Sequence, residues 1–120
     1  MPGKICVSIT HAKNDTDKAT VGFVVANASV ASAQDTLVFL STEAVRIAVK
    51  GYAEEIHEPG FAPLHELVSN FAKAGGRIYV CSPCFKKRGL DEKALIEGAT
   101  IVGGAKLVEF LAAGAACISY

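Results

Sequence analysis

Two cysteines stand three positions apart in Cys81-Ser82-Pro83-Cys84, and a run of three cations, Lys86-Lys87-Arg88, follows them. The thiolate is the nucleophilic form of cysteine, and both a helix N-terminus and neighbouring cations favour it. The preceding residues 77–81 have the composition of a strand, whereas Ser82 and Pro83 are typical of a helix start, with Ser82 as N-cap and Pro83 at the first helical position. The segment therefore predicts a reactive thiol at a strand-to-helix junction.

The two thiols of this segment are not equivalent. Cys84 is expected in the first turn of the helix, where it faces unpaired backbone N–H groups and the following cations. Cys81 is expected further back, less exposed and more dependent on loop groups such as His11. Local electrostatics therefore favour Cys84 as the more reactive thiol.

Strand and helix patterns alternate along the whole chain, and hairpin turns are absent. The strands also lack alternating polarity, which is typical of a parallel sheet covered by helices. We predict a single α/β domain over residues 1–120, a three-layer α/β/α sandwich with a mostly parallel five-stranded sheet. Its strands are expected at residues 4–10, 36–41, 77–81, 99–102 and 115–120, and its helices at 16–33, 42–49, 64–73, after Cys81, and at 106–112.

The predicted helix at residues 16–33 is apolar nearly all round. Asp15, Thr16 or Asp17 can cap it. Such a helix is covered on two sides, by its own sheet and by something else, and another subunit is the simplest candidate.

Parallel sheets collect their ligands outside the carboxyl ends of the strands. The loops after the first three strands would therefore converge on one site. We expect that site to contain Cys81 and Cys84, supported by His11, Asn14, Asp15, Glu43 and Arg88.

Several of these residues also have simpler interpretations. His11 is often a loop histidine bonded to backbone, and Asn14 and Asp15 are typical turn and capping residues. Cys6 and Cys117 each lie within a strand-like run and are expected to be packing residues. A zinc site would need two further ligands, such as His57 and His65, and one C-x-x-C is weak support for it, so no metal is predicted. No nucleotide-binding motif is present, so no cofactor is expected.

The composition restricts the classes of partner. Lys and Arg number 12 and Asp and Glu number 12, so the formal net charge is zero, and neither nucleic acid nor a membrane is an expected partner. Apolar residues make up 51% of the chain, which favours self-association. With no signal-peptide pattern at its start, the chain is expected to be cytoplasmic, with reduced thiols.

Three segments of the chain resemble the DsrE/DsrF-like family of sulfur-relay proteins: residues 9–15, the strand around 38–40, and the block 81–90 with its Arg88-Gly89 pair. The resemblance covers nearly the whole chain. It implies a small α/β subunit that assembles as a dimer, trimer or hexamer. It also implies a cysteine that accepts sulfane sulfur as a persulfide from a donor protein and passes it to an acceptor protein. Family members with a single cysteine here keep the one matching Cys81, so the resemblance favours Cys81 as carrier and Cys84 as a resolving or second carrier thiol.

Three functions are consistent with these observations. The first is a sulfurtransferase-type sulfur carrier that holds a cysteine persulfide. The second is a redox-active protein with a reversible Cys81–Cys84 disulfide. The third is a non-catalytic oligomeric regulatory module whose thiols only pack.

Overall fold

The computed structural model describes residues 2–120 and contains one five-stranded sheet in which all neighbouring strands are parallel. The strand order is β4-β3-β2-β1-β5, so β4 and β5 form the two edges. This arrangement confirms the predicted α/β class and parallel sheet. The strands are β1 (Lys4–Ile9), β2 (Asp35–Leu40), β3 (Arg77–Cys81), β4 (Ala99–Val102) and β5 (Ala116–Ser119).

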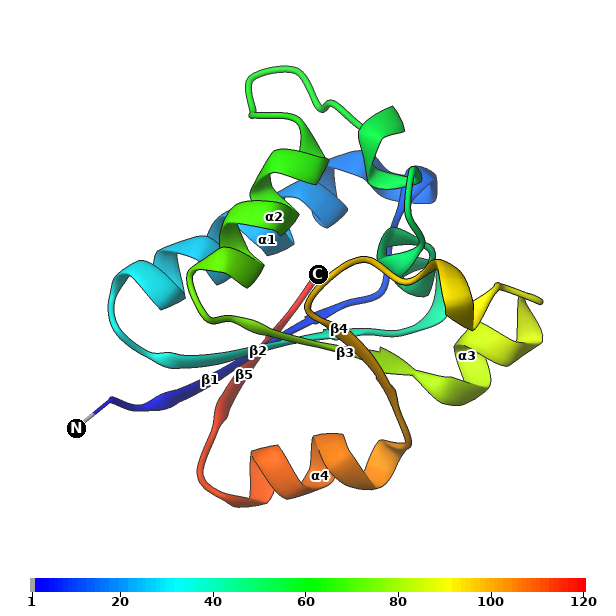
Figure 1. Ribbon diagram of the computed structural model, residues 1–120. Coiled ribbons are helices and arrows are strands. Elements are labelled where there is room, and N and C mark those ends of the chain that lie inside the picture. The colour runs from blue at the N-terminus through cyan, green and yellow to red at the C-terminus, as the bar shows by residue number, and fades with distance from the viewer. Residues whose placement is uncertain (1) are drawn as a thin grey trace.

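Helices lie on both faces of the sheet, which completes the predicted three-layer sandwich. Figure 1 shows α1 (Thr16–Ala31) and α2 (Leu64–Lys73) above the sheet, and α4 (Gly104–Ala112) alone below it. The short α3 (Ser82–Lys87) follows β3 at the carboxyl end of the sheet. Four 3₁₀ segments complete the fold, at Lys13–Asp15, Thr42–Ala48, Ala53–Glu55 and Glu92–Ala94.

Most element boundaries match the sequence pattern, with small shifts. Asp15 caps α1, because its side chain accepts a hydrogen bond from the Lys18 backbone N–H at 3.1 Å. The helix ends at Ala31, two residues earlier than predicted, and Ala33 then adopts a positive φ of 60°. The predicted helix over residues 42–49 is a 3₁₀ helix, and α4 begins at Gly104 rather than at 106.

The core above the sheet depends on a close approach of α1 to β1. Gly22 makes this approach feasible, because a Cβ atom there would lie 2.7 Å from Cδ1 of Ile9. On its other side α1 packs against α2, and the Phe23 and Phe71 rings meet edge to face with centroids 6.1 Å apart. The second cover expected for the apolar helix is therefore supplied by α2 of the same chain, and another subunit is not needed there.

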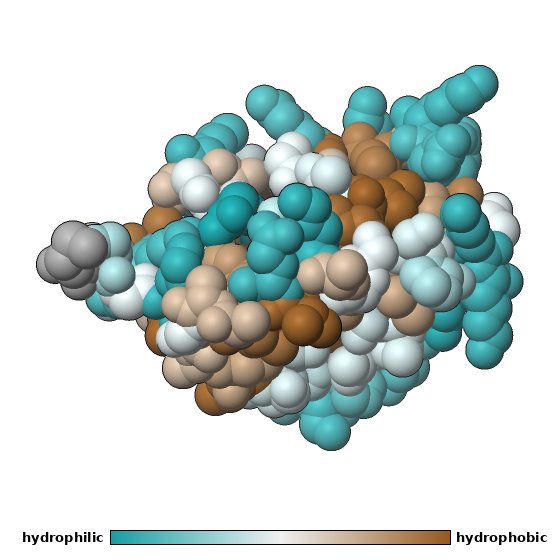
Figure 2. Space-filling view, turned by 90° about the horizontal axis from the view of Figure 1, so that it is seen from below, coloured by the Kyte–Doolittle hydropathy of each residue, from teal (hydrophilic) through white to brown (hydrophobic). Residues whose placement is uncertain are grey.

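The face below the sheet is thinly covered. Phe110 of α4 packs against Cys6, Leu37 and Phe39 in a small second core. Figure 2, which looks at this face, shows brown apolar side chains reaching the surface. Val108 of α4 is 62% exposed and Ile118 of the edge strand β5 is 44% exposed. In the part of the chain that the structure describes, no helix has the length and apolar character needed to cross a bilayer.

Candidate thiol site

The two thiols of the C-x-x-C segment lie at the junction of β3 and α3. Cys81 is both the last residue of β3 and the N-cap residue of α3, so the helix begins at Ser82, with Pro83 second and Cys84 third. The prediction that Ser82 would be the N-cap was wrong by one residue. Cys84 still lies in the first turn, and both thiols are half-buried.

Cys84 has the environment of a thiolate. Burial alone would raise its pKa, but the opposing contacts prevail and the pKa lies below its ordinary value. The largest of these contacts is a hydrogen bond from the Cys81 thiol, followed by a hydrogen bond from the Thr42 backbone N–H and by the charges of Arg88 and Lys87. A sulfur surrounded by donors and cations is stabilised as the anion, so Cys84 is the electrostatically favoured nucleophile.

Cys81 has the complementary environment of a thiol. Burial raises its pKa above the ordinary value. A hydrogen bond donated by the Cys81 thiol to Cys84 raises the pKa further, because this bond is lost when Cys81 gives up its proton. The Cys84 backbone N–H and the Arg88 charge act in the opposite direction without reversing the outcome. The pair therefore divides into a donor thiol at Cys81 and an acceptor sulfur at Cys84. This division agrees with the expectation from local electrostatics that Cys84 is the more reactive thiol. It differs from the preference for Cys81 that the family resemblance implied.

Thr42 is the residue whose backbone N–H helps to lower the pKa of Cys84. Its φ of 51° lies in the left-handed region, which a β-branched residue adopts at a cost of about 1–3 kcal/mol. The Thr42 hydroxyl donates to the carbonyl oxygen of Thr10 at 2.6 Å, which secures this conformation against the end of β1. A strained backbone held next to the reactive sulfur is a feature typical of functional sites.

Arg88 is held beside the thiols by two partners. Its Nε donates to Glu43 Oε2 at 2.6 Å, and its Nη1 donates to the carbonyl oxygen of Cys84 at 3.1 Å. Arg46 Nε donates to the other Glu43 oxygen at 2.9 Å. The hydrogen bond from Arg88, followed by that from Arg46, keeps the pKa of the Glu43 carboxyl below its ordinary value. Glu43 therefore remains an anion and orients Arg88 without contacting the thiols itself.

The other predicted site residues occupy the loop after β1. This loop is separated from the thiols by β2, which lies between β1 and β3 in the sheet. His11 Nδ1 lies 3.0 Å from the Thr10 hydroxyl, Asn14 Oδ1 accepts from the Ala12 N–H at 2.8 Å, and Asp15 caps α1. Within residues 2–120, no hydrogen bond or ion pair joins these three side chains to Cys81 or Cys84. Their contacts are those of turn and capping residues.

Sequence reasoning missed two residues of the site, Thr42 and Arg46. Nothing in the sequence signals a left-handed threonine, since that conformation is imposed by the tertiary contact with Thr10. The Glu43–Arg46 spacing is a signal that could have been used, because it suits an ion pair within one helical turn.

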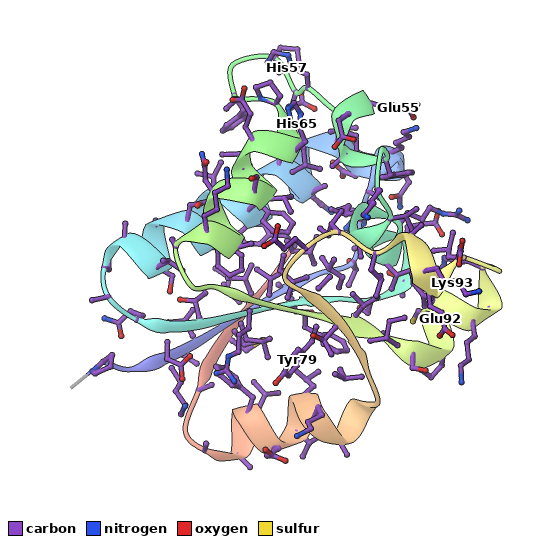
Figure 3. All side chains as sticks on the ribbon, viewed as in Figure 1. Glu55, His57, His65, Tyr79, Glu92 and Lys93 are labelled. Atoms are coloured by element: carbon purple, nitrogen blue, oxygen red, sulfur yellow. The ribbon has the colours of Figure 1, made fainter. Side chains whose placement is uncertain are left out.

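The histidines considered for a metal site lie elsewhere. Figure 3 shows His57 and His65 together at the top of the helical layer, whereas Glu92 and Lys93 mark the loop beside α3. His57 Nε2 lies 2.8 Å from the Phe61 carbonyl oxygen. Across residues 2–120, no group of three or more His, Cys, Asp or Glu side chains is arranged to hold a metal ion.

The sequence matches one known family along nearly its full length. The model of the DsrE/DsrF-like family matches residues 3–120. The chain is 31% identical over 109 residues to the uncharacterized protein MJ0989 of Methanocaldococcus jannaschii. The matched region covers 90% of this chain and 91% of that protein. It is also 29% identical over 102 residues to the uncharacterized protein MJ0760 of the same organism, covering 85% of this chain but spanning only 37% of that longer protein.

Solved structures with the same fold have lower sequence identity. The ychN protein from E. coli superimposes with a TM-score of 0.79 at 20% identity, covering 100% of both chains. A protein of unknown function, BT1422 from Bacteroides thetaiotaomicron, gives a TM-score of 0.70 at 17% identity, covering 98% of this chain and 94% of its own. At these identities the structural likeness establishes the fold.

Proposed function

Because the chain belongs to the DsrE/DsrF-like family, we propose that it is a sulfur carrier whose Cys84 thiolate accepts sulfane sulfur as a persulfide. The observation that carries the proposal is the environment of Cys84: hydrogen bonds from Cys81 and Thr42, and the nearby Arg88 and Lys87 charges, lower the pKa of a half-buried thiol. A sulfur carrier needs an accessible, low-pKa thiol more than it needs a deep substrate pocket. Cys81 acts as the partner thiol.

The loading step is an exchange at sulfur. The Cys84 thiolate attacks the outer sulfur of a persulfide on a donor protein, so that a new S–S bond forms at Cys84 and the donor's S–S bond breaks. The donor leaves as a thiolate, and Cys84 holds the transferred sulfur as Cys84–S–SH. With thiosulfate as a small donor, the same attack on the sulfane sulfur releases sulfite. Arg88 and the Thr42 N–H lie where they stabilise the sulfur anion before and after the exchange.

Two reactions can discharge the carrier. In the relay reaction, a thiolate of an acceptor protein attacks the outer sulfur, takes it as a persulfide and regenerates the Cys84 thiolate. In the competing reaction, Cys81 loses its proton and attacks the inner sulfur, which forms a Cys81–Cys84 disulfide and releases hydrosulfide. The raised pKa of Cys81 slows the competing reaction and so prolongs the persulfide.

Intact mass spectrometry after incubation with thiosulfate or polysulfide tests this proposal. Wild type and Cys81→Ser should each gain one sulfur, a mass increase of about 32 Da. Cys84→Ser should gain none. Hydrosulfide release should require both thiols, so Cys81→Ser should retain its persulfide longer than wild type does.

The matched control is the variant Cys6→Ser/Cys117→Ser, which loses two thiols but keeps the whole thiol site. It should load sulfur as wild type does. An adduct that persists in Cys84→Ser, or the absence of an adduct in wild type, would contradict the proposal.

A redox-active dithiol is the second candidate, and the proximity of the Cys81 and Cys84 thiols, each of which shifts the pKa of the other, supports it. In this case the pair would cycle between dithiol and disulfide with no sulfur added. Titration in thiol buffers measures the reduction potential. A potential far above that of the cytosolic thiol pool would keep the pair reduced and eliminate this candidate.

Self-association is part of the same proposal, and a second copy of the chain is the proposed occupant of the outer face of α4, which leaves the β5 edge open. The support is the exposure of the apolar Val108 on that face. Light scattering after size exclusion should show a dimer, trimer or hexamer that Val108→Glu disrupts, whereas a wild-type monomer at all concentrations would contradict it. We also propose a cytoplasmic location, which the four free cysteines support.

A further inference from the structure

A second pair of thiols lies at the β5 edge of the sheet, which is the edge opposite β4. Cys6 of β1 and Cys117 of β5 are directly paired in the parallel register, so their side chains lie on the same face of the sheet, and the presence of Cys117 contributes to the raised pKa of Cys6. Adjacent strands are about 4.8 Å apart, within the range of Cα separations that disulfides span. The sulfur relay proposed above uses neither thiol.

The two members of this pair differ in access. Cys6 is fully buried under α4, whereas Cys117 is exposed on the edge strand. The expectation that both are packing residues therefore holds for Cys6 only, because all four residues of β5 are exposed. Burial, followed by the charge and hydrogen bond of Cys117, raises the pKa of Cys6 to about 12. A dissolved oxidant would thus meet Cys117 first, with Cys6 protected behind it.

We propose that Cys6 and Cys117 form a second redox site, which closes as an intramolecular disulfide when the protein meets a peroxide. The Cys117 sulfur attacks one oxygen of the peroxide, the O–O bond breaks, and with hydrogen peroxide one water leaves as Cys117 becomes a sulfenic acid. The Cys6 sulfur then attacks the Cys117 sulfur, the S–S bond forms, and the S–O bond breaks. The leaving hydroxide takes the Cys6 proton as a second water, so two thiols are oxidised and one peroxide is reduced.

The disulfide would cross-link the edge strand β5, which few side-chain contacts stabilise. All four residues of β5 are exposed, and the strand pairs only with β1. Just after β5, the carbonyl oxygen of Tyr120 accepts from the Thr10 N–H at 2.9 Å and from the Thr10 hydroxyl at 3.0 Å. A covalent link between β1 and β5 would therefore restrain residues 116–120. A thiol reductant would release it.

Non-reducing tryptic mapping of the wild-type protein after peroxide treatment tests the proposal directly. Cleavage after Lys4, Lys13 and Lys106 places Cys6 on peptide 5–13 and Cys117 on peptide 107–120. The expected product is these two peptides joined, about 2 Da lighter than their sum and separated by reductant. Cys81 and Cys84 share peptide 78–86, so a disulfide between them gives a different product.

Peptide mapping detects the Cys6–Cys117 disulfide without any sulfur donor. Failure of this proposal can therefore be distinguished from failure of the sulfur-carrier proposal, which the mass increase at Cys84 tests. Cys117→Ser should leave Cys6 unoxidised at a peroxide dose that links the wild-type pair. Hydrogen exchange of the 116–119 amides should slow at least about tenfold in the linked protein. Alkylation of both cysteines as free thiols after peroxide, a link between two chains, or unchanged exchange in the linked protein would each overturn the proposal.

Discussion

The protein contains two pairs of neighbouring thiols whose surroundings differ. Cys81 and Cys84 lie where β3 meets α3, beside Arg88 and the Thr42 N–H. Cys6 and Cys117 are partners in the register of β1 and β5, with Cys6 among the apolar side chains of the second core and Cys117 exposed on the edge strand. In the first pair, one sulfur has a lowered pKa, whereas in the second pair the pKa of Cys6 rises to about 12.

The difference shows that a neighbouring thiol alone does not produce a reactive cysteine. In each pair the neighbouring thiol shifts the pKa of a cysteine, so a thiol neighbour is common to both pairs. The first pair also has cations and a backbone donor, which stabilise an anion despite the cost of partial burial. In the second pair, burial is the largest cause of the raised pKa of Cys6 and favours its neutral thiol. The site chemistry is therefore set by what surrounds the thiols.

Of the substitutions that test the difference between the two thiol pairs, the removal of Cys84 should have the largest effect, which is on the alkylation rate. At neutral pH we expect alkylation of the native wild-type protein by iodoacetamide to have one fast phase, which comes from the Cys84 thiolate. Cys84→Ser should lose that phase, with the remaining rate lower by about tenfold or more. Cys81→Ser should keep it. A fast phase that survives in Cys84→Ser would assign the reactive thiol to another position.

Removing the Arg88 charge should make the first pair more like the second. Arg88→Gln takes away a cation that lowers the pKa of Cys84, so the alkylation rate at pH 7 should fall about three- to tenfold. The pH profile should also shift to higher pH. Lys86→Gln, an exposed residue of the same helix, is the matched control and should change the rate little. Equal effects of the two substitutions would mean that the site responds only to net charge.

Cys6 should affect the alkaline stability of the fold. Its pKa is raised in the folded protein, so above the ordinary cysteine pKa the unfolded chain releases this proton while the folded protein keeps it. The associated stability is present below that pKa and declines as the pH rises toward about 12, by at most about 1.4 kcal/mol per pH unit. Urea unfolding at a series of alkaline pH values should show a shallower decline for Cys6→Ala. Parallel declines would contradict the assignment.

Cys117 should matter least for stability under reducing conditions. Its side chain is exposed and fills no cavity, so Cys117→Ser should change the free energy of unfolding by less than about 0.5 kcal/mol. Cys6→Ser, which places a hydroxyl in the buried position, should cost more. Urea unfolding of both variants in reductant makes this comparison. A large loss for Cys117→Ser would show that β5 depends on this side chain.

The architecture could be predicted from the sequence because each strand is a short apolar run and each helix has a recognisable stop. Gly75-Gly76 after α2 is one such stop, with Gly75 at a φ of 95°. The role of α2 as cover for α1 could not be predicted, since it depends on the packing of Phe23 against Phe71 rather than on local pattern. The exposure of Cys117 was missed for a similar reason: the sequence of β5 does not reveal that it is an edge strand.

The thiol site was only partly predictable. Cys81, Cys84 and Arg88 are close in sequence, so the turn from β3 into α3 brings them together. Glu43 comes from another loop, and its proximity to Arg88 follows from β2 and β3 being neighbours. The expectation for His11 depended on strand order, and β2 lies between its strand and β3. Thr42 could not be foreseen because its conformation depends on the contact with Thr10.

The most direct test of the central claim is a residue-resolved titration of the two junction thiols. The ¹³Cβ chemical shifts of Cys81 and Cys84, followed across pH in the reduced protein, report which sulfur becomes the anion first. The account predicts that Cys84 titrates below the ordinary cysteine range and that Cys81 titrates above it. If Cys81 ionises first, or if Cys84 titrates like a free cysteine, the account is contradicted.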